Sequence, residues 1–238
     1  MMWIIVDKRL PVAAKNKLKT FGNLIEFESA GIVYEAISGH PDIFMCHAGN
    51  ELILAPNIPE IYPNIFFRNN IPFALGSKPL GNKYPHTAHY NAVVSSKFLI
   101  HNIKHTDDAI LQKCKNKTAI NTPQAYTRCN LLALDDTSFI TSDSFTNKLL
   151  QSLKLNACFI SPENIVLPGF PNGFFGGCCG IYQKKLFVSG SLTYLNAKND
   201  VIGFVEKCGY DIIELYNGPL FDAGGLFFIN SQKPFVNI

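Results

Sequence analysis

A hairpin pattern that recurs about every 45 residues constrains this fold more than any other feature of the sequence. Its clearest copy, residues 174–190 (FFGGCCGIYQKKLFVSG), joins a strand of small residues to an apolar strand through a polar, basic turn. The weaker copies span residues 41–56, 86–102, 124–143 and 221–238. Equivalent positions of the second strands are held by Leu52, Phe98, Phe139, Leu186 and Phe235. A period of this length indicates a repeat protein in which each unit packs against its neighbours.

A helix and one further strand separate successive hairpins. In the last copy Asn199 or Asp200 is expected to cap a helix that ends at Gly209, and residues 210–215 form the strand that follows. The same pattern predicts helices near Pro11, Pro59, Thr106 and Ser144. The strands expected after them span residues 23–28, 65–68, 118–121 and 157–160. The repeating unit is therefore strand–strand–helix–strand.

Five such units occupy nearly the whole chain, which predicts one α/β domain over residues 1–238. The N-terminal segment MWIIVD resembles the second strands of the hairpins, so we expect it to help complete the fifth unit and close the units into a ring. Closure would protect the edge strands that an open array of sheets leaves exposed.

Composition excludes several classes of protein. A hydrophobic content of 47% with 16% charged residues is typical of a compact globular protein. The net charge of +3 comes without runs of Lys or Arg, which argues against a nucleic-acid or membrane-surface partner. No apolar stretch is long enough to span a membrane, and Asp7 interrupts the N-terminal segment too early for a secretory signal. The seven cysteines fit neither a disulfide framework nor paired zinc motifs, so we expect a cytoplasmic protein. The sequence does not indicate an oligomeric state.

The first strands of the hairpins contain most of the polar residues that are unusual in an otherwise apolar strand. We therefore expect these first strands to face a ligand. Asp42 and Asp222 each introduce a strand, where a carboxylate either shapes the turn or binds a cationic or amide-bearing ligand. Arg128 is a further candidate for ligand binding, through a ligand carboxylate, although an ion pair with Asp135 or Asp136 is the plainer expectation. The other candidate ligand-binding residues are His47, His89, Asn91 and Asn130.

A cysteine nucleophile requires a lowered thiol pKa and a neighbouring base. Cys178 is the first candidate nucleophile, with Cys179 and Cys129 as alternatives, and His86 is the first candidate base, with His89 and His47 as alternatives. Packing of Cys178 and Cys179 as small buried residues is the plainer interpretation. The histidine spacings lack the further ligands of a zinc site, and His101 and His105 are expected at the surface. The glycine-rich segments match no nucleotide-binding motif, so neither a metal nor a cofactor is predicted.

With these units in place, the sequence resembles the pentein superfamily, whose guanidino-modifying enzymes form a five-bladed α/β propeller of ββαβ modules with pseudo-fivefold symmetry. The segments PDIFMCHAGNELILAP (residues 41–56) and CNLLALDDTSFITSDSFTN (residues 129–147) are similar to its first and third modules, and DAGGLFFIN (residues 222–230) to its fifth. The resemblance covers essentially the full chain and implies a central ligand pocket.

The catalytic residues of these enzymes do not carry over. The resemblance places Asp42 at a substrate-binding carboxylate, but it places Asn130 at a second acidic position. The nucleophilic cysteine of the fifth module falls on or near Phe228, and the histidine of the fourth module falls near Phe174. The superfamily also includes a non-catalytic translation factor, so its fold alone does not imply an activity.

Three hypotheses follow from the sequence. The first is a pentein-like protein without Cys–His catalysis that binds a small guanidino- or amide-bearing ligand in its central pocket. The second is a cysteine-dependent hydrolase or amidinotransferase with a relocated nucleophile. The third is a non-catalytic protein-interaction module.

Overall fold

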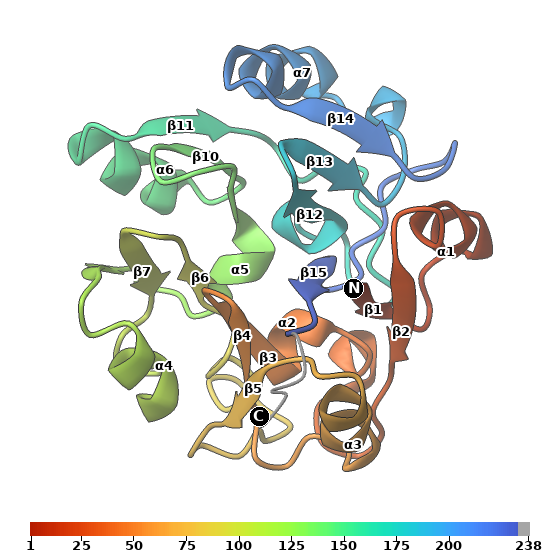
Figure 1. Ribbon diagram of the computed structural model, residues 1–238. Helices are drawn as coiled ribbons and strands as arrows, with labels where there is room; N and C mark the ends of the chain where they lie inside the picture. Colours follow the sequence, from red (N-terminus) through yellow and green to blue (C-terminus); the bar gives the residue numbers. More distant parts are fainter. Residues whose placement is uncertain (233–238) are drawn as a thin grey trace.

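A computed structural model describes residues 1–232 and contains five three-stranded sheets arranged in a ring (Figure 1). Each sheet consists of an antiparallel hairpin and a third strand that runs parallel to the second strand of the hairpin. The sheets are formed by β15 (Phe227–Asn230), β1 (Met2–Asp7) and β2 (Asn23–Phe27); β3 (Met45–Ala48), β4 (Glu51–Leu54) and β5 (Phe73–Leu75); β6 (Val93–Val94), β7 (Phe98–His101) and β8 (Thr118–Asn121); β9 (Leu131–Ala133), β10 (Ser138–Thr141) and β11 (Asn156–Phe159); and β12 (Cys179–Tyr182), β13 (Lys185–Val188) and β14 (Asp211–Glu214).

One helix connects the second and third strands of each sheet and lies on the outer side of the ring (Figure 1). These helices are α1 (Val12–Leu18), α3 (Ile61–Arg68), α4 (Asp108–Lys113), α6 (Ser144–Ser152) and α7 (Lys198–Lys207). Each connection is the crossover that two parallel neighbouring strands require. The predicted five-bladed propeller of ββαβ modules is therefore confirmed.

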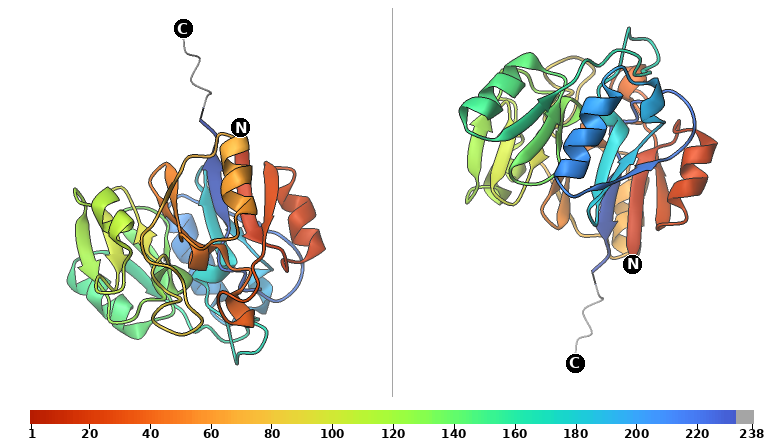
Figure 2. Two further views of the ribbon diagram at one scale, coloured as in Figure 1. Left: turned by 90° about the horizontal axis from the view of Figure 1, so that it is seen from below. Right: turned by 90° about the horizontal axis from the view of Figure 1, so that it is seen from above.

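The ring closes through the two ends of the described chain. β1 pairs antiparallel with β15, with Met2 opposite Asn230 and Ile5 opposite Phe227. Figure 2 shows the first and last strands of the described chain side by side. The N-terminal strand thus supplies the second strand of the fifth unit, as the sequence predicted. Phe235, which the period places in a second strand, lies outside the described residues.

The second unit differs from the prediction. Residues 65–68, expected as a strand, continue helix α3, and the strand of this unit is β5. Pro63 lies in the first turn of α3, where a missing N–H breaks no intrahelical hydrogen bond. Tyr62 and Phe66, four residues apart, both turn towards the core and continue the buried face of the helix.

The expected helix caps are wrong in detail. Asp107 caps α4 by accepting from the Ala109 N–H, and Asp143 caps α6 by accepting from the Thr146 N–H. α7 begins at Lys198, before the expected capping residues, and no side chain caps it. Helix packing compensates, because Val201 and Val205 of α7 are completely buried.

The strands nearest the centre of the ring begin later than expected, because a single helical turn precedes three of them. The turns are α2 (Pro41–Phe44), α5 (Thr127–Asn130) and the 3₁₀ turn η2 (Gly176–Cys178). Two further 3₁₀ turns, η1 (Glu35–Ile37) and η3 (Leu192–Tyr194), lie in the loops. Three of the polar residues expected on the first strands, Asp42, Arg128 and Asn130, therefore lie on these turns. Within residues 1–232, no helix has the length and apolar character that crossing a bilayer requires.

Candidate functional site

A layer of buried polar side chains lies where α2 and α5 meet the segment before β6. We call Asp42, Asn91 and Cys129 the central layer. Cys129 donates its thiol proton to Asp42 Oδ2 at 3.1 Å, and Asn91 Nδ2 donates to the Asp42 carbonyl at 3.1 Å. Asn91 Oδ1 accepts from the Cys129 N–H at 3.2 Å. All three residues are buried, and Asp42 Oδ1 has no hydrogen-bond partner among the described residues.

Electrostatics oppose full ionisation of the central layer. Burial raises the pKa of Asp42, although the Arg128 guanidinium and the hydrogen bonds from Cys129 and Asn91 lower it. Burial also raises the pKa of the Cys129 thiol far above its ordinary value, and the neighbouring carboxylates of Asp42 and Asp222 raise it further. The thiol of this layer is therefore a hydrogen-bond donor and a poor nucleophile at neutral pH.

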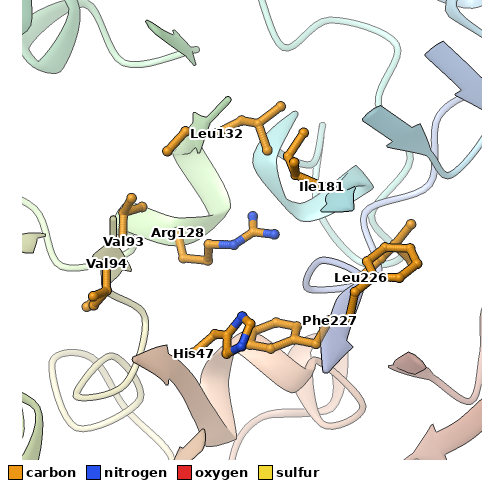
Figure 3. Close-up of a pocket in the computed structure, with 11 residues that line it drawn as sticks. His47, Val93, Val94, Arg128, Leu132, Ile181, Leu226 and Phe227 are labelled. Atoms are coloured by element: carbon orange, nitrogen blue, oxygen red, sulfur yellow. The ribbon is translucent and has the colours of Figure 1, made fainter. Parts of the chain in front are cut away.

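On one side of the central layer, Arg128 extends into a cavity of about 200 Å³ that we call the Arg128 pocket (Figure 3). Its guanidinium donates to the Gly176 carbonyl at 2.6 Å and to the Cys179 carbonyl at 2.9 Å, and it lies 5.8 Å from the centroid of the Phe227 ring. The cavity is lined by His47, Ala92, Val93, Val94, Arg128, Leu132, Ala133, Ile181, Leu226, Phe227 and Phe228.

The predicted ion pair between Arg128 and Asp135 or Asp136 is wrong. Asp135 Oδ1 accepts from the N–H groups of Thr137 and Ser138 in the β9–β10 turn. Asp136 accepts from the side chain of Ser96 and the N–H of Lys97. Asp135 is thus used within its own turn and Asp136 by the β6–β7 turn of the neighbouring unit. The Arg128 side chain points towards the centre of the ring instead (Figure 3).

A second cavity, of about 180 Å³, shares no lining residue with the first. We call it the Asp222 pocket. Asp222 is 1% exposed, and its carboxylate accepts from the Phe174 N–H at 2.9 Å and the Gly224 N–H at 3.1 Å. The cavity is lined by Tyr34, Ile37, His40, Ile43, Tyr126, Cys129, Leu167, Phe170, Asn172, Phe174 and Asp222. Aromatic and aliphatic side chains therefore surround one buried carboxylate.

His40 is the second polar group of the Asp222 pocket. Its ring nitrogens lie 3.9 Å from Asp222 Oδ1 and 3.9 Å from Asp7 Oδ2, beyond hydrogen-bond distance, and neither has a partner among the described residues. Asp7 is already paired with Arg9, whose Nη2 donates to Oδ2 at 2.6 Å. Burial lowers the pKa of His40, against the charges of Asp222 and Asp7, which raise it. The imidazole is thus held neutral and unsatisfied beside a carboxylate.

Sequence reasoning missed His40, Asp7 and Arg9. Asp7 ends β1, and Arg9 follows it in a turn, so their proximity to His40 depends on closure of the ring. His40 precedes Pro41 and is held in an extended conformation, which suits a residue before proline. Its position directly before Pro41-Asp42 was the signal that could have drawn attention to it.

The other predicted site residues lie apart from the Asp222 pocket. His47 lines the Arg128 pocket, and burial together with Arg128 lowers its pKa to about 4. His89 donates from Nδ1 to the His105 carbonyl at 2.7 Å, and His86 is exposed beside it. Asn130 donates to the Tyr126 carbonyl and accepts from Ser142, within its own unit.

The prediction that His101 lies at the surface is wrong. Its side chain is completely buried, with Nδ1 2.7 Å from Thr106 Oγ1 and Nε2 2.7 Å from the Ala125 carbonyl. Burial lowers the pKa of His101 to about 4. The residue therefore joins β7 to the loop before α5 as a neutral, hydrogen-bonded core side chain.

The candidate thiol–imidazole pair does not form in this structure. Cys178 is buried, its Sγ lies 3.4 Å from the Phe174 carbonyl, and burial raises its thiol pKa far above the ordinary value. Across residues 1–232, no cysteine sulfur is hydrogen-bonded to a histidine ring, and no group of three or more His, Cys, Asp or Glu side chains has metal-binding geometry.

Thiol alkylation tests this arrangement. In the native protein, iodoacetamide is expected to modify the partly exposed Cys158 and Cys208 first and to leave Cys178 and the other four buried thiols largely unmodified, because only a solvent-accessible thiolate reacts rapidly. Mass spectrometry of the alkylated peptides over time measures the order. Rapid modification of Cys178 or Cys129 that a guanidino compound suppresses would contradict the arrangement and revive a cysteine-dependent reaction.

Comparisons with known proteins agree with the architecture. A model described as a family of unknown function, DUF6873, matches residues 5–227. No curated protein matches the sequence. DDAH from Pseudomonas aeruginosa, solved as a cysteine-to-serine mutant complexed with citrulline, shares 10% identity at a TM-score of 0.53, over 89% of this chain and 91% of its own.

Two further structures show the same similarity. SxtG, an amidinotransferase from Microseira wollei in the saxitoxin biosynthetic pathway, shares 10% identity at a TM-score of 0.53, over 98% of this chain and 94% of its own. Agmatine deiminase from C. jejuni shares 7% identity at a TM-score of 0.52, over 90% of this chain and 87% of its own. At these identities the similarity establishes a divergent pentein fold and no activity.

Proposed function

The chain belongs to a family of unknown function, DUF6873, and from that premise we propose that it is a divergent pentein-fold protein, without the Cys–His catalysis of the enzymes, that binds a small guanidino- or amide-bearing ligand in the Asp222 pocket. The single observation that carries the proposal is His40, a buried imidazole with two unpartnered nitrogens beside the buried carboxylate of Asp222. Buried polar groups are almost always hydrogen-bonded, so this pair is suited to a ligand that donates to both.

A guanidinium or amidinium group matches the polar atoms of this pocket. It presents several N–H donors in one plane, which can reach a carboxylate oxygen and the unprotonated nitrogen of a neutral imidazole together. Asp222 has no Lys or Arg side chain within ion-pair distance among residues 1–232, and Arg9, whose charge acts on His40, is bound to Asp7. A cationic ligand would supply the positive countercharge that the buried Asp222 carboxylate lacks.

The walls and the volume of the pocket limit the ligand further. Tyr34, Phe170 and Phe174 offer aromatic faces, which attract a planar cation. The cavity of about 180 Å³ is equivalent to about six water molecules of liquid volume, which suits a small metabolite and excludes a peptide or nucleotide. Among the structural neighbours, one binds citrulline and another is an agmatine deiminase, so citrulline and agmatine are suitable first probes.

Thermal shift and calorimetry with agmatine, methylguanidine and citrulline test the proposal. A ligand at about 100 times its dissociation constant stabilises the native state by about 2.7 kcal/mol, which corresponds to about 5–10 °C in a protein of this size. Asp222→Asn is expected to weaken binding of the cationic probes by about tenfold or more, because it removes the charge that the ligand neutralises. The absence of any shift with all three probes would contradict the proposal.

A second variant separates binding from folding, because Asn at position 222 also disturbs two backbone hydrogen bonds. Phe170 is 48% exposed, so Phe170→Ala removes one aromatic wall of the pocket with little effect on the fold. We expect this substitution to weaken binding of a cationic ligand by about three- to tenfold. Phe145→Ala is the matched control, since Phe145 is 53% exposed on α6 and does not line the pocket. Equal effects of the two substitutions would count against this pocket.

The pH dependence distinguishes a cationic ligand from a neutral amide. Burial raises the pKa of Asp222, and the neighbouring Asp42 raises it further, against the charge of His40, which lowers it. As the pH falls, protonation of Asp222 removes the negative charge and protonation of His40 adds a positive one, and each change weakens binding of a cation. Affinity for agmatine is therefore expected to increase with pH more steeply than affinity for citrulline, whose ureido group is neutral. Calorimetry across pH 5 to 8 measures the difference.

The two other hypotheses, a cysteine-dependent enzyme and a protein-interaction module, have less support. A cysteine-dependent hydrolase or amidinotransferase requires a thiolate beside a base, whereas the buried thiols of Cys129 and Cys178 have raised pKa values and no imidazole partner in residues 1–232. A protein-interaction module is favoured by no particular surface feature, and a negative ligand screen would make it the next hypothesis.

A further inference from the structure

We propose that the Arg128 pocket is a second ligand site, which binds a small monocarboxylate with an apolar body. The inference goes beyond the proposed function, because this cavity and the Asp222 pocket share no lining residue. Neighbours in the sequence divide between the two cavities: Arg128 lines one, and Cys129 lines the other. Cys129 also belongs to the central layer, where it is hydrogen-bonded to Asp42 and Asn91.

The charge of Arg128 has no carboxylate partner at ion-pair distance within residues 1–232. Its two hydrogen bonds go to the neutral carbonyls of Gly176 and Cys179, and three of the five guanidinium N–H donors remain. Asp42 contributes a longer-range attraction, but its Oδ2 accepts from Cys129 inside the central layer. A half-buried guanidinium that no carboxylate pairs at short range, and that keeps free N–H donors, favours an anion.

The guanidinium is held in place before any ligand binds. The two carbonyl contacts fix its plane, and the Phe227 ring lies beside it at 5.8 Å from Cζ. Gly225 leaves space for the guanidinium, because a Cβ atom at this position would lie 2.9 Å from Arg128 Nη2. Its φ of +81° is also a conformation that favours glycine. A preorganised cation of this kind loses little entropy when an anion binds.

The remaining walls determine which anion fits. Val93, Val94, Leu132, Ile181 and Leu226 surround the guanidinium with aliphatic groups (Figure 3). His47, the other titratable side chain on the wall, is neutral above pH 5, so the pocket offers one positive charge. One cation beside these aliphatic side chains suits a singly charged carboxylate with an aliphatic or aromatic body, whereas a dianionic phosphate would lose its hydration without sufficient compensation.

Calorimetry with benzoate, and with benzamide as its neutral isostere, tests the site. Benzoate is expected to bind the unmodified protein at least about tenfold more tightly than benzamide, because only benzoate pairs with the guanidinium. Arg128→Met, which keeps a long apolar side chain but removes the charge, should abolish this preference. Equal binding of benzoate and benzamide, or no benzoate binding at millimolar concentration, overturns the proposal.

A second variant keeps the proposal falsifiable if Arg128→Met does not fold, since that substitution leaves two carbonyls without their donor. Val94 is a partly buried residue at the wall, so Val94→Trp fills the cavity while Arg128 keeps its contacts. Val94→Trp is expected to weaken benzoate binding by about tenfold or more. Val12→Trp, on the exposed face of α1, is the matched control and should leave benzoate binding unchanged. Undiminished binding by Val94→Trp would place the benzoate site elsewhere and overturn the proposal.

Discussion

Gly176→Ala is expected to lower the free energy of unfolding by about 3 kcal/mol, through a steric conflict between η2 and α5 at the centre of the ring. A Cβ atom on Gly176 would lie 2.4 Å from the Arg128 carbonyl oxygen and 2.6 Å from the Cys129 carbonyl oxygen. Both are backbone atoms, so a turn must move before the methyl group fits. In a protein of this size the loss corresponds to a decrease in Tm of about 6–12 °C.

Gly203→Ala provides the matched control for this prediction. Gly203 lies on the exposed face of α7, and a Cβ atom there would meet nothing within 4 Å. Since alanine favours the helix, this substitution is expected to stabilise the protein by up to about 1 kcal/mol. Calorimetric or denaturant unfolding of the two variants gives the comparison. A loss below about 1 kcal/mol for Gly176→Ala would show that the central turns are not packed as closely as the structure describes.

Asp107→Asn is expected to cost about 3 kcal/mol of stability at neutral pH, because a buried carboxylate loses its charge and part of its capacity to accept hydrogen bonds. Asp107 Oδ2 accepts from the N–H groups of Ser77 and Lys78 at 2.9 and 2.7 Å and from the Tyr90 hydroxyl at 2.9 Å. Its Oδ1 accepts from the Ala109 N–H at 2.8 Å. One side chain therefore caps α4 and fastens the loop after β5 to it.

The neighbouring residue is the control for Asp107→Asn. Asp108 is exposed and forms an ion pair with Lys78 at 3.1 Å, so Asp108→Asn should cost at most about 1 kcal/mol. Denaturant unfolding measures both variants. Similar losses at the two positions would contradict the role assigned to the buried hydrogen bonds.

The contribution of Asp107 depends on pH with a definite sign. Burial raises its pKa, but the hydrogen bonds from Lys78, Ala109, Ser77 and Tyr90 outweigh burial, so its pKa in the folded protein lies below the ordinary value. A lowered pKa stabilises the native state above the unfolded pKa of about 3.9 and loses that contribution as the pH falls through the folded pKa. The stability difference between the unmodified protein and Asp107→Asn should therefore be constant above about pH 5 and decrease in acid.

Much of the architecture could be predicted from local sequence signals. Alternating and helical periodicities placed most of the helices and strands, and the ββαβ order of the units followed from their succession. The strand expected at 65–68 is wrong, because these residues continue helix α3, in which Pro63 occupies a first-turn position that is compatible with a helix. The single turns α2, α5 and η2 also escaped prediction, because four or fewer residues carry no periodic signal.

The candidate site was predicted only in part. Asp42, Asn91, Arg128 and Asp222 were singled out because polar residues are unusual beside apolar strands, and the structure brings all four to the centre of the ring. The direction of each side chain could not be predicted. Arg128 points away from Asp135 and Asp136 because two carbonyls from another unit accept its hydrogen bonds.

The sequence by itself determined the repeating unit and its near-fivefold recurrence. These properties depend on residue identity and on spacing along the chain. Only the tertiary structure decided that His40 lies unsatisfied between Asp222 and Asp7, and that Arg128 faces a cavity without a carboxylate partner at ion-pair distance among the described residues. Those relations join residues from different units, and closure of the ring sets the distances between them.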